Sequence, residues 1–266
     1  MQQKCTIKTV QRLIYHKKEM IYLAGHSKFA NIKHRKEKND AARGKVFTRL
    51  GREIQMAVKQ WGADPAGNSR LRDVIAKAKH ENMSNDTIER SIKKASGDNE
   101  QVNYEAATYE GYGPGGVAII VNALTDNRNR AAANIRHAFT KGGGNLGTPG
   151  CVSFMFKEAG QIMVETECGM DEESLMMLAL DSGAEDFMPV EGGYEIITTA
   201  TSFSAVREAL ESKSIPMASA DITMLPSTFA KLNTPDEVKL MNKLLNLLDD
   251  EDDVQDVYHN LEEDSL

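Results

Sequence analysis

The stretch from Ala24 to Gln60 decides the fold, and it reads AGHSKFANIKHRKEKNDAARGKVFTRLGREIQMAVKQ. Its first part is rich in lysine and arginine and has few large apolar residues, so it predicts a surface arm rather than a core element. After Lys45 the large apolar residues recur at a spacing of three and four, which is the pattern of a helix that buries one face. These residues are Phe47, Leu50, Ile54, Ala57, Val58 and Trp61. We therefore expect a basic arm followed by an amphipathic helix from about Arg43 to Trp61.

The basic residues of this helix fall on the side opposite its apolar face. At about 100° per residue, Lys45, Arg49, Arg52 and Lys59 form a second stripe, which predicts a basic ridge that faces solvent. Such a ridge suits phosphates, although an ordinary solvated helix face has the same pattern. The candidate nucleic-acid-binding residues of the arm and ridge are Lys28, Lys33, His34, Arg35, Lys36, Lys38, Arg43, Lys45, Arg49 and Arg52. Arg128 and Arg130 are candidates for a secondary contact.

Charge is divided unevenly along the 266 residues. Residues 1–97 hold 22 Lys and Arg against 9 Asp and Glu, a net charge of +13. Residues 98–266 hold 10 against 30, a net charge of −20, so the whole chain carries −7. An asymmetry of this kind is typical of a chain with one end that faces nucleic acid and a separate acidic body.

Composition and spacing argue against several classes of protein. The three cysteines form no C-x-x-C pair, and the six histidines lack the spacing of a hydrolytic metal site, so neither a disulfide framework nor a metal centre is indicated. The run Asp249–Asp253 lacks the glycine and spacing of an EF-hand and is interpreted as a solvated charge run. No apolar run approaches the roughly 20 residues of a membrane span. We expect a cytoplasmic protein with no cofactor, metal, membrane contact or small-molecule substrate. Mitochondrial import is the less favoured alternative, because residues 1–22 are basic but hold one Arg and no Ser.

Working outward from the helix, the periodicity predicts an α+β chain of several domains. Two further helices, from Asn68–Ser69 and after Ser84, complete a three-helix domain that ends before Gly97. The pattern then reads β-β-α, β-β-α-β-β-α and finally β-α-β with its first strand around Ala220–Leu225. Because the first and last units each lack strands, we infer that they complete one another around an inserted block. The predicted segments are a 1–23 extension, a 24–97 basic helical domain, a 98–147 plus 216–266 α+β domain, and a 148–215 inserted α+β domain.

Two glycine-rich matches do not support nucleotide binding. Gly111 to Gly116 and Gly142 to Gly147 both fit G-x-G-x-x-G, but the first joins two strands and the second follows a helix. The helix N-terminus that would hold a pyrophosphate is therefore missing, and tight turns are the better interpretation. The segment Gly142–Gly147 stays open as a mobile recognition loop, since glycine leaves backbone donors accessible.

Long motifs follow one another from about Ala24 to Asn260. They are AGHSKFANIKHRKEKNDAARGKVFTRL, NSRLRDVIAKAKHENM, DTIERSIKKASG, YEGYGPGGVAIIV, TDNRNR, IRHAFTKGGGNLGTPGCVSFMF, GAEDF and DVYHN. In this order they closely resemble the YebC/PmpR family, which includes a mitochondrial translational activator of cytochrome c oxidase. The resemblance implies an α-helical N-terminal domain followed by two α+β domains, and a role in gene expression without catalysis. Phe29 replaces the tryptophan usual in the family. Leu23 stands where the family has its first methionine, so we expect residues 1–22 to be absent from the native chain.

The sequence thus predicts a non-enzymatic, nucleic-acid-binding regulator of gene expression. As a DNA-binding transcriptional regulator it would need base readout, for which Asn31, His34 and Arg35 are eligible, though not in helix-turn-helix spacing. The alternative is a factor that binds the ribosome or ribosomal RNA and relieves stalled translation. That role would need only shape and phosphate contacts. Family members of both kinds are described.

Overall fold

The computed structural model describes residues 40–97, 103–190 and 192–262. It contains helices together with two separate four-stranded sheets, which confirms the predicted α+β class. The 1–23 extension and the arm candidates lie outside the described residues. These candidates are Lys28, Lys33, His34, Arg35, Lys36 and Lys38.

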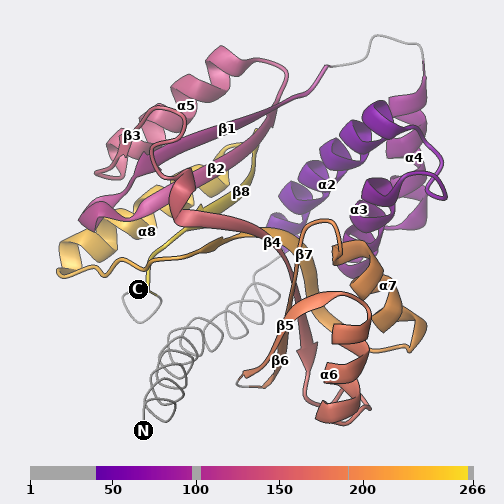
Figure 1. Cartoon of the computed structure of the whole chain (residues 1–266). Coiled ribbons are helices and arrows are strands. Elements are labelled where there is room, and N and C mark those ends of the chain that lie inside the picture. The colour runs from indigo at the N-terminus through magenta and orange to yellow at the C-terminus, as the bar shows by residue number, and fades with distance from the viewer. Residues whose placement is uncertain (1–39, 98–102, 191, 263–266) are drawn as a thin grey trace, which may run out of the picture. The chain divides into compact units, whose positions relative to one another are not determined.

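The N-terminal helical part follows the predicted pattern (Figure 1). Its helices are α2 (Asp40–Trp61), α3 (Ser69–His80) and α4 (Asn85–Ser96). Their apolar faces pack into one cluster that includes Leu50, Ile54, Leu71 and Ile88. Trp61, which was expected on the buried face of α2, is 69% exposed instead. The helix ends at this residue, so the indole lies beyond the last turn that α3 and α4 cover.

The turn between α2 and α3 is fixed by one buried side chain. Asn68 accepts a hydrogen bond from the backbone N–H of Leu71 at 2.9 Å, which caps the first turn of α3. Its amide nitrogen donates to the carbonyl oxygens of Ala57 and Gly62, at 2.9 and 2.8 Å. A single asparagine therefore satisfies backbone groups at the end of one helix and at the start of the next.

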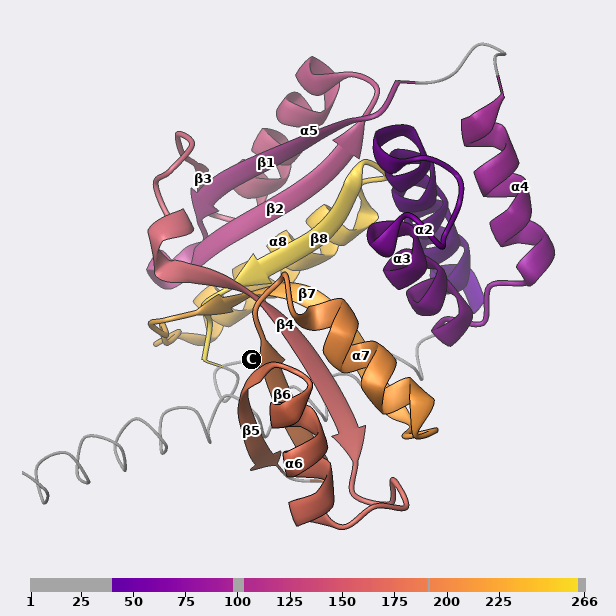
Figure 2. The ribbon, with the colours of Figure 1, turned by 45° about the vertical axis from the view of Figure 1, so that its right-hand side comes forward.

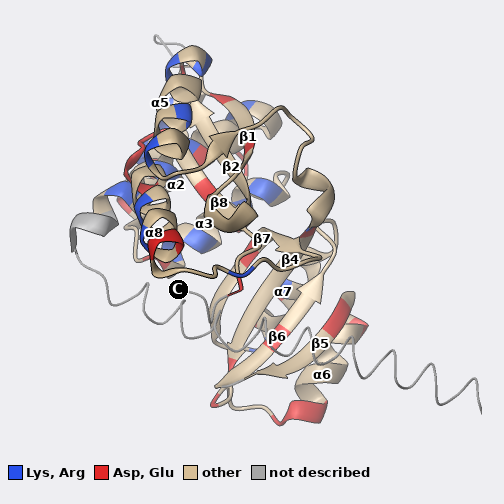
Figure 3. Cartoon of the chain, turned by 90° about the vertical axis from the view of Figure 1, so that its left-hand side faces the viewer, with Lys and Arg blue, Asp and Glu red and all other residues tan. Residues whose placement is uncertain are grey.

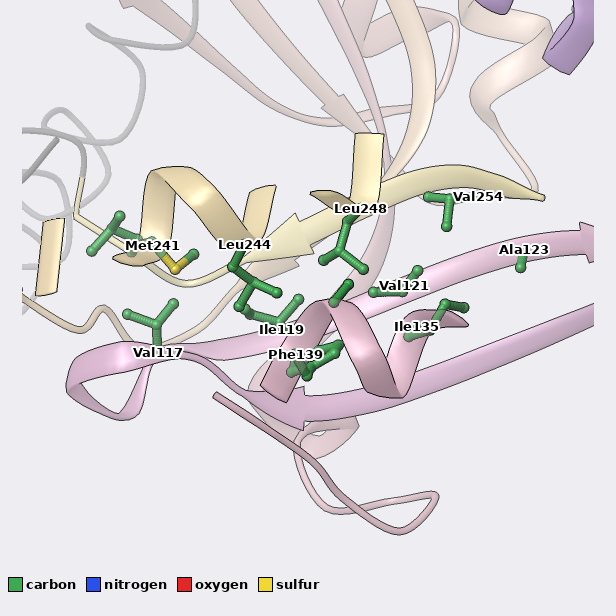
Figure 4. Close-up of a cluster of buried hydrophobic side chains, with 12 residues drawn as sticks. Val117, Ile119, Val121, Ala123, Ile135, Phe139, Met241, Leu244, Leu248 and Val254 are labelled. Atoms are coloured by element: carbon green, nitrogen blue, oxygen red, sulfur yellow. The ribbon is translucent and has the colours of Figure 1, made fainter. Parts of the chain in front are cut away.

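The first sheet has the strand order β3-β1-β2-β8 (Figure 2). Its strands are β1 (Glu105–Tyr112), β2 (Ala118–Thr125), β3 (Asn145–Leu146) and β8 (Val254–His259). The helices α5 (Arg128–Lys141) and α8 (Pro235–Asp250) cover one face. Figure 4 shows Ile119 and Val121 of β2 pointing toward Phe139 of α5 and Leu244 of α8. Residues 105–146 and 235–259 therefore share one core, although about 90 residues separate them in the sequence.

The glycines after α5 are packed rather than open. A Cβ added at Gly142 would lie 2.8 Å from Cα of Leu244 in α8, and one at Gly144 would lie 2.5 Å from the carbonyl oxygen of Tyr112. The chain then enters β3, which pairs with β1. The interpretation of Gly142–Gly147 as a mobile recognition loop is therefore wrong, because close backbone packing requires these glycines.

The second sheet has the order β5-β6-β4-β7 and is built from a β-α-β-β-α-β run. Its elements are β4 (Phe156–Glu165), α6 (Glu172–Asp181), β5 (Ala184–Val190), β6 (Gly193–Thr198), α7 (Phe203–Ser212) and β7 (Met217–Pro226). Buried side chains of α6 and α7, including Leu175 and Val206, pack on Ile162 and Ile196 of the strands.

Two details of the expected chain order change. The strand predicted around Ala220–Leu225 forms as β7, but it belongs to the second sheet and does not complete the first one. The first strand of the predicted β-β-α-β-β-α block, expected near Val152–Phe156, does not form, and the short 3-10 helix η2 (Ser153–Met155) leads into β4 instead. Apolar alternation identifies a strand but not the sheet it joins, since pairing depends on distant residues. The domain boundaries, including the inserted block, stay a prediction.

Candidate nucleic-acid interface

The predicted basic ridge of α2 is covered by the acidic run Asp249–Asp253, which begins in the last turn of α8. Nζ of Lys45 lies 2.5 Å from Oδ1 of Asp250, and Nη1 of Arg49 lies 3.0 Å from Oδ1 of Asp249. Nη1 of Arg52 lies 3.1 Å from Oδ1 of Asp253. The three cations follow one another at intervals of one turn, and each meets a carboxylate of the same short segment. The ridge therefore does not face solvent as expected.

Arg49 and Arg52 are held more firmly than an exposed ion pair would hold them. Arg49 also donates from Nη2 to the carbonyl oxygen of Asp249 at 2.8 Å, and its side chain is only 13% exposed. Arg52, which is 14% exposed, donates to the carbonyl oxygens of Asp252 and Leu124. Its guanidinium lies 5.2 Å from the ring centre of Tyr104. Several donors of each guanidinium are thus used at once.

Asp253 is the centre of this network. Its side chain is 9% exposed, and Oδ2 accepts hydrogen bonds from Oγ1 of Thr125 and Nη2 of Arg130, both at 2.9 Å. Arg130 also lies 2.6 Å from Oδ1 of Asp126. The hydrogen bonds to Asp253 and Asp126 raise the pKa of Arg130, and the hydrogen bond from Arg130 lowers the pKa of Asp126. Arg130 thus holds Asp253 in place and is a poor candidate for the secondary contact.

These partners correct the interpretation of Asp249–Asp253 as a solvated charge run. Asp249 and Asp250 are 62% and 71% exposed, yet both bind α2, and Asp253 is buried. The signal in the sequence that could have predicted this contact was charge complementarity between a basic stripe and an acidic run of similar length. Nothing local in the sequence pairs segments about 200 residues apart. Of the other candidates, Arg43 lies in α2, and Arg128 is an exposed residue 3.9 Å from Glu105.

A second basic surface lies on the two helices that cover the first sheet, and the sequence analysis did not single it out. It consists of Arg136 and Lys141 on α5 together with Lys239 and Lys243 on α8, and we call it the α5/α8 basic face. All four are exposed, and none forms an ion pair with another described residue. Figure 3 shows blue segments recurring along α5 and no red ones on that helix.

The two helices that carry these cations pack against one another. Gly142 and Gly143, which follow Lys141, pack on Leu244 and Leu240 of α8. Lys243 and Lys239 directly precede those two leucines. Nearer the middle of α5, the amide of Asn134 donates to Glu251 at 2.9 Å, so the helices run antiparallel. The four cations are therefore exposed residues of the two packed helices that cover one face of the first sheet, within the acidic residues 98–266.

Within the described ranges, no group of three His, Cys, Asp or Glu residues is arranged to hold a metal ion. A search of the same residues finds no helix with both the length and the apolar character needed to cross a bilayer.

Two models of known protein families match most of the chain. The model described as the TACO1/YebC protein N-terminal domain matches residues 27–98, and the model of the TACO1/YebC second and third domain matches residues 104–261. The chain belongs to the TACO1/YebC family. The matched ranges include α2, the acidic run and the α5/α8 basic face, so both surfaces lie in the family's domains. The resemblance seen in the sequence is thereby confirmed.

Two curated relatives and one solved structure are similar to most of the chain. A protein of Agathobacter rectalis is 61% identical over 242 residues, covering 91% of this chain and 100% of that relative. A protein of Lachnoclostridium phytofermentans is 59% identical over 242 residues, which again cover 91% of this chain and 100% of that relative. Both are named probable transcriptional regulatory proteins. The crystal structure of a conserved hypothetical protein from Aquifex aeolicus is 45% identical, with a TM-score of 0.75, over 85% of this chain and 93% of that one.

Proposed function

We propose that the protein is a non-enzymatic regulator of gene expression that binds nucleic acid, with duplex DNA as its partner in transcription regulation. The observation that carries the proposal is the α5/α8 basic face, four exposed cations within residues 98–266, whose net charge is −20. Relatives named as probable transcriptional regulatory proteins support the same role. We place this activity in the cytoplasm.

Phosphate binding needs cations that are accessible and not already neutralised. The α5/α8 basic face meets both conditions within the described residues, whereas Lys45, Arg49 and Arg52 hold carboxylates. We propose that the arm, from Lys28 to Lys38, and Arg43 add to this contact, with exposed Arg128 beside it. Contacts of this kind fix position on the duplex and supply affinity with little base preference.

The test is the salt dependence of binding. Fluorescence anisotropy with a labelled 30-base-pair duplex should give a linear decrease of log K with log salt for the full chain. Changing Arg136, Lys141 and Lys243 together to Gln should lower the slope by about 2–3 units, because each lost phosphate contact removes roughly 0.7–0.9. Circular dichroism should be unchanged, since all three side chains are exposed.

The matched control changes Lys157, Lys213 and Lys231 to Gln, which removes the same charge from exposed residues on other elements. Equal slopes for the two triple variants would show that only total charge matters. Failure of the unmodified chain to bind either duplex DNA or folded RNA would reject the proposed function.

Structured RNA, including ribosomal RNA, is the second candidate partner. The observation that favours it is the composition of the α5/α8 basic face, in which Lys and Arg contact phosphates of either polymer without reading bases. Competition between the labelled duplex and unlabelled ribosomal RNA at fixed salt separates the two. Preferential displacement by RNA would assign the protein to translation instead of transcription.

A further inference from the structure

We infer that the acidic run Asp249–Asp253 is an intramolecular competitor for the basic stripe of α2, so that nucleic acid must displace part of it before α2 can bind phosphates. This inference rests on the proposed function and concerns how that function is regulated. In the folded chain, the carboxylates of Asp249 and Asp250 accept hydrogen bonds from Arg49 and Lys45, respectively. A phosphate oxygen would accept hydrogen bonds from the same N–H donors and be attracted by the same positive charges.

The three ion pairs differ in how easily they can be released. Those of Asp249 and Asp250 involve well-exposed carboxylates, which water and salt screen, so they open at a lower cost than a fully buried pair, even though Arg49 also donates to the carbonyl oxygen of Asp249. The pair of Arg52 with Asp253 is buried and shared with Arg130 and Thr125. Opening it would leave uncompensated charge in the interior. We therefore assign the first two pairs to the displaceable part and Asp253 to a permanent anchor.

The two displaceable pairs, Lys45–Asp250 and Arg49–Asp249, lie outside the apolar cores. The buried apolar cluster of the helical part contains residues from 46 to 95 alone, and that of the first sheet contains none of them. A pocket of about 140 Å³ remains at the contact, lined by Gly44, Lys45, Thr48, Arg49, Glu251 and Asp252. Charged side chains, not shared apolar packing, thus hold the acidic run against α2 at Lys45 and Arg49.

The experiment measures a gain of affinity in the full-length protein. Asp249→Asn with Asp250→Asn keeps side-chain size and removes the competing charges. Binding to a labelled 30-base-pair duplex at low salt should become about 3- to 30-fold tighter, the range expected when two ion pairs with exposed carboxylates no longer need to be broken. The control is Glu158→Gln with Asp181→Asn, which changes net charge equally at exposed positions on β4 and α6, outside both α2 and the α5/α8 basic face. The gain beyond this control is the quantity that matters.

A double-mutant cycle identifies the site of competition. Adding Lys45→Gln and Arg49→Gln to the Asp249→Asn, Asp250→Asn variant should abolish the gain, because the freed cations are then missing. A gain that persists in this background, or one no larger than that of the control, would overturn the inference while leaving the proposed function intact. If the parent chain and every variant fail to bind, the proposed function and this inference fall together.

Discussion

Glu110 fastens the loop before β4 to the first sheet, and its replacement gives a measurable prediction. Its carboxylate is buried, and it accepts backbone hydrogen bonds from Gly150 at 2.7 Å on Oε1 and from Val152 and Ser153 at 2.9 and 2.8 Å on Oε2. Glu110→Gln keeps the size of the side chain but supplies only one acceptor oxygen. The amide group must then face at least one backbone N–H donor.

The structure sets the size of the effect. With its oxygen toward Val152 and Ser153, the glutamine converts two charge-assisted hydrogen bonds into neutral ones, a loss of about 1 kcal/mol each. The bond to Gly150 is lost outright and leaves a buried donor, which costs a further ~1.5–3 kcal/mol. We therefore expect Glu110→Gln to lower the free energy of unfolding by about 3–5 kcal/mol.

The pKa of Glu110 adds a dependence on pH. Burial raises this pKa, but the backbone N–H groups of Gly150, Val152 and Ser153 outweigh burial and hold it below its ordinary value. Since the folded pKa is depressed, the carboxylate stabilises the protein above the unfolded pKa of about 4.3, and this contribution is lost as pH falls through the folded value. The difference between the parent and Glu110→Gln should therefore be full at pH 7 and shrink below about pH 4.

Urea unfolding followed by circular dichroism at pH 7 and at acid pH tests both parts. Glu158→Gln is the matched control, because Glu158 is an exposed glutamate on β4 without a hydrogen bond to another described residue. If Glu110→Gln costs no more than the control at pH 7, or if its cost does not decrease in acid, the assignment of Glu110 as the acceptor that holds this loop is refuted.

Two further perturbations follow from the packing. Asn68→Ala removes the cap of α3 and both hydrogen bonds that Asn68 donates at the end of α2, so we expect urea unfolding to show a decrease of about 2–4 kcal/mol in the free energy of unfolding. The control is Asn246→Ala at an exposed position, and an equally small decrease for both variants would contradict this role of Asn68. Removing residues 159–222 and joining the ends with a short Gly/Ser linker should leave a cooperatively melting protein, since α5, α8 and the first sheet keep their shared core. A non-cooperative melt would refute the nested arrangement.

Local periodicity accounts for most of the helices and strands. The apolar positions of α2 to α4 lie three and four apart, and side chains such as Leu50 and Leu71 are buried where that spacing places them. Caps added precision at Asn68 and Ser84, because a short polar side chain before a periodic run satisfies the free backbone N–H groups. The family resemblance likewise depended on long motifs that remain in order along the chain.

Tertiary structure decided how these elements were shared and which charges remained available. The pattern identified β7 as a strand, but pairing with β4 placed it in the second sheet. The pattern identified Lys45, Arg49 and Arg52 as one stripe, but Asp249, Asp250 and Asp253 cover it from about 200 residues away. Helical and strand periods are properties of neighbouring residues, whereas the accessibility of a charge depends on every segment that folds against it. The sequence by itself therefore determined the elements and the family, and the folded chain determined which basic surface is open.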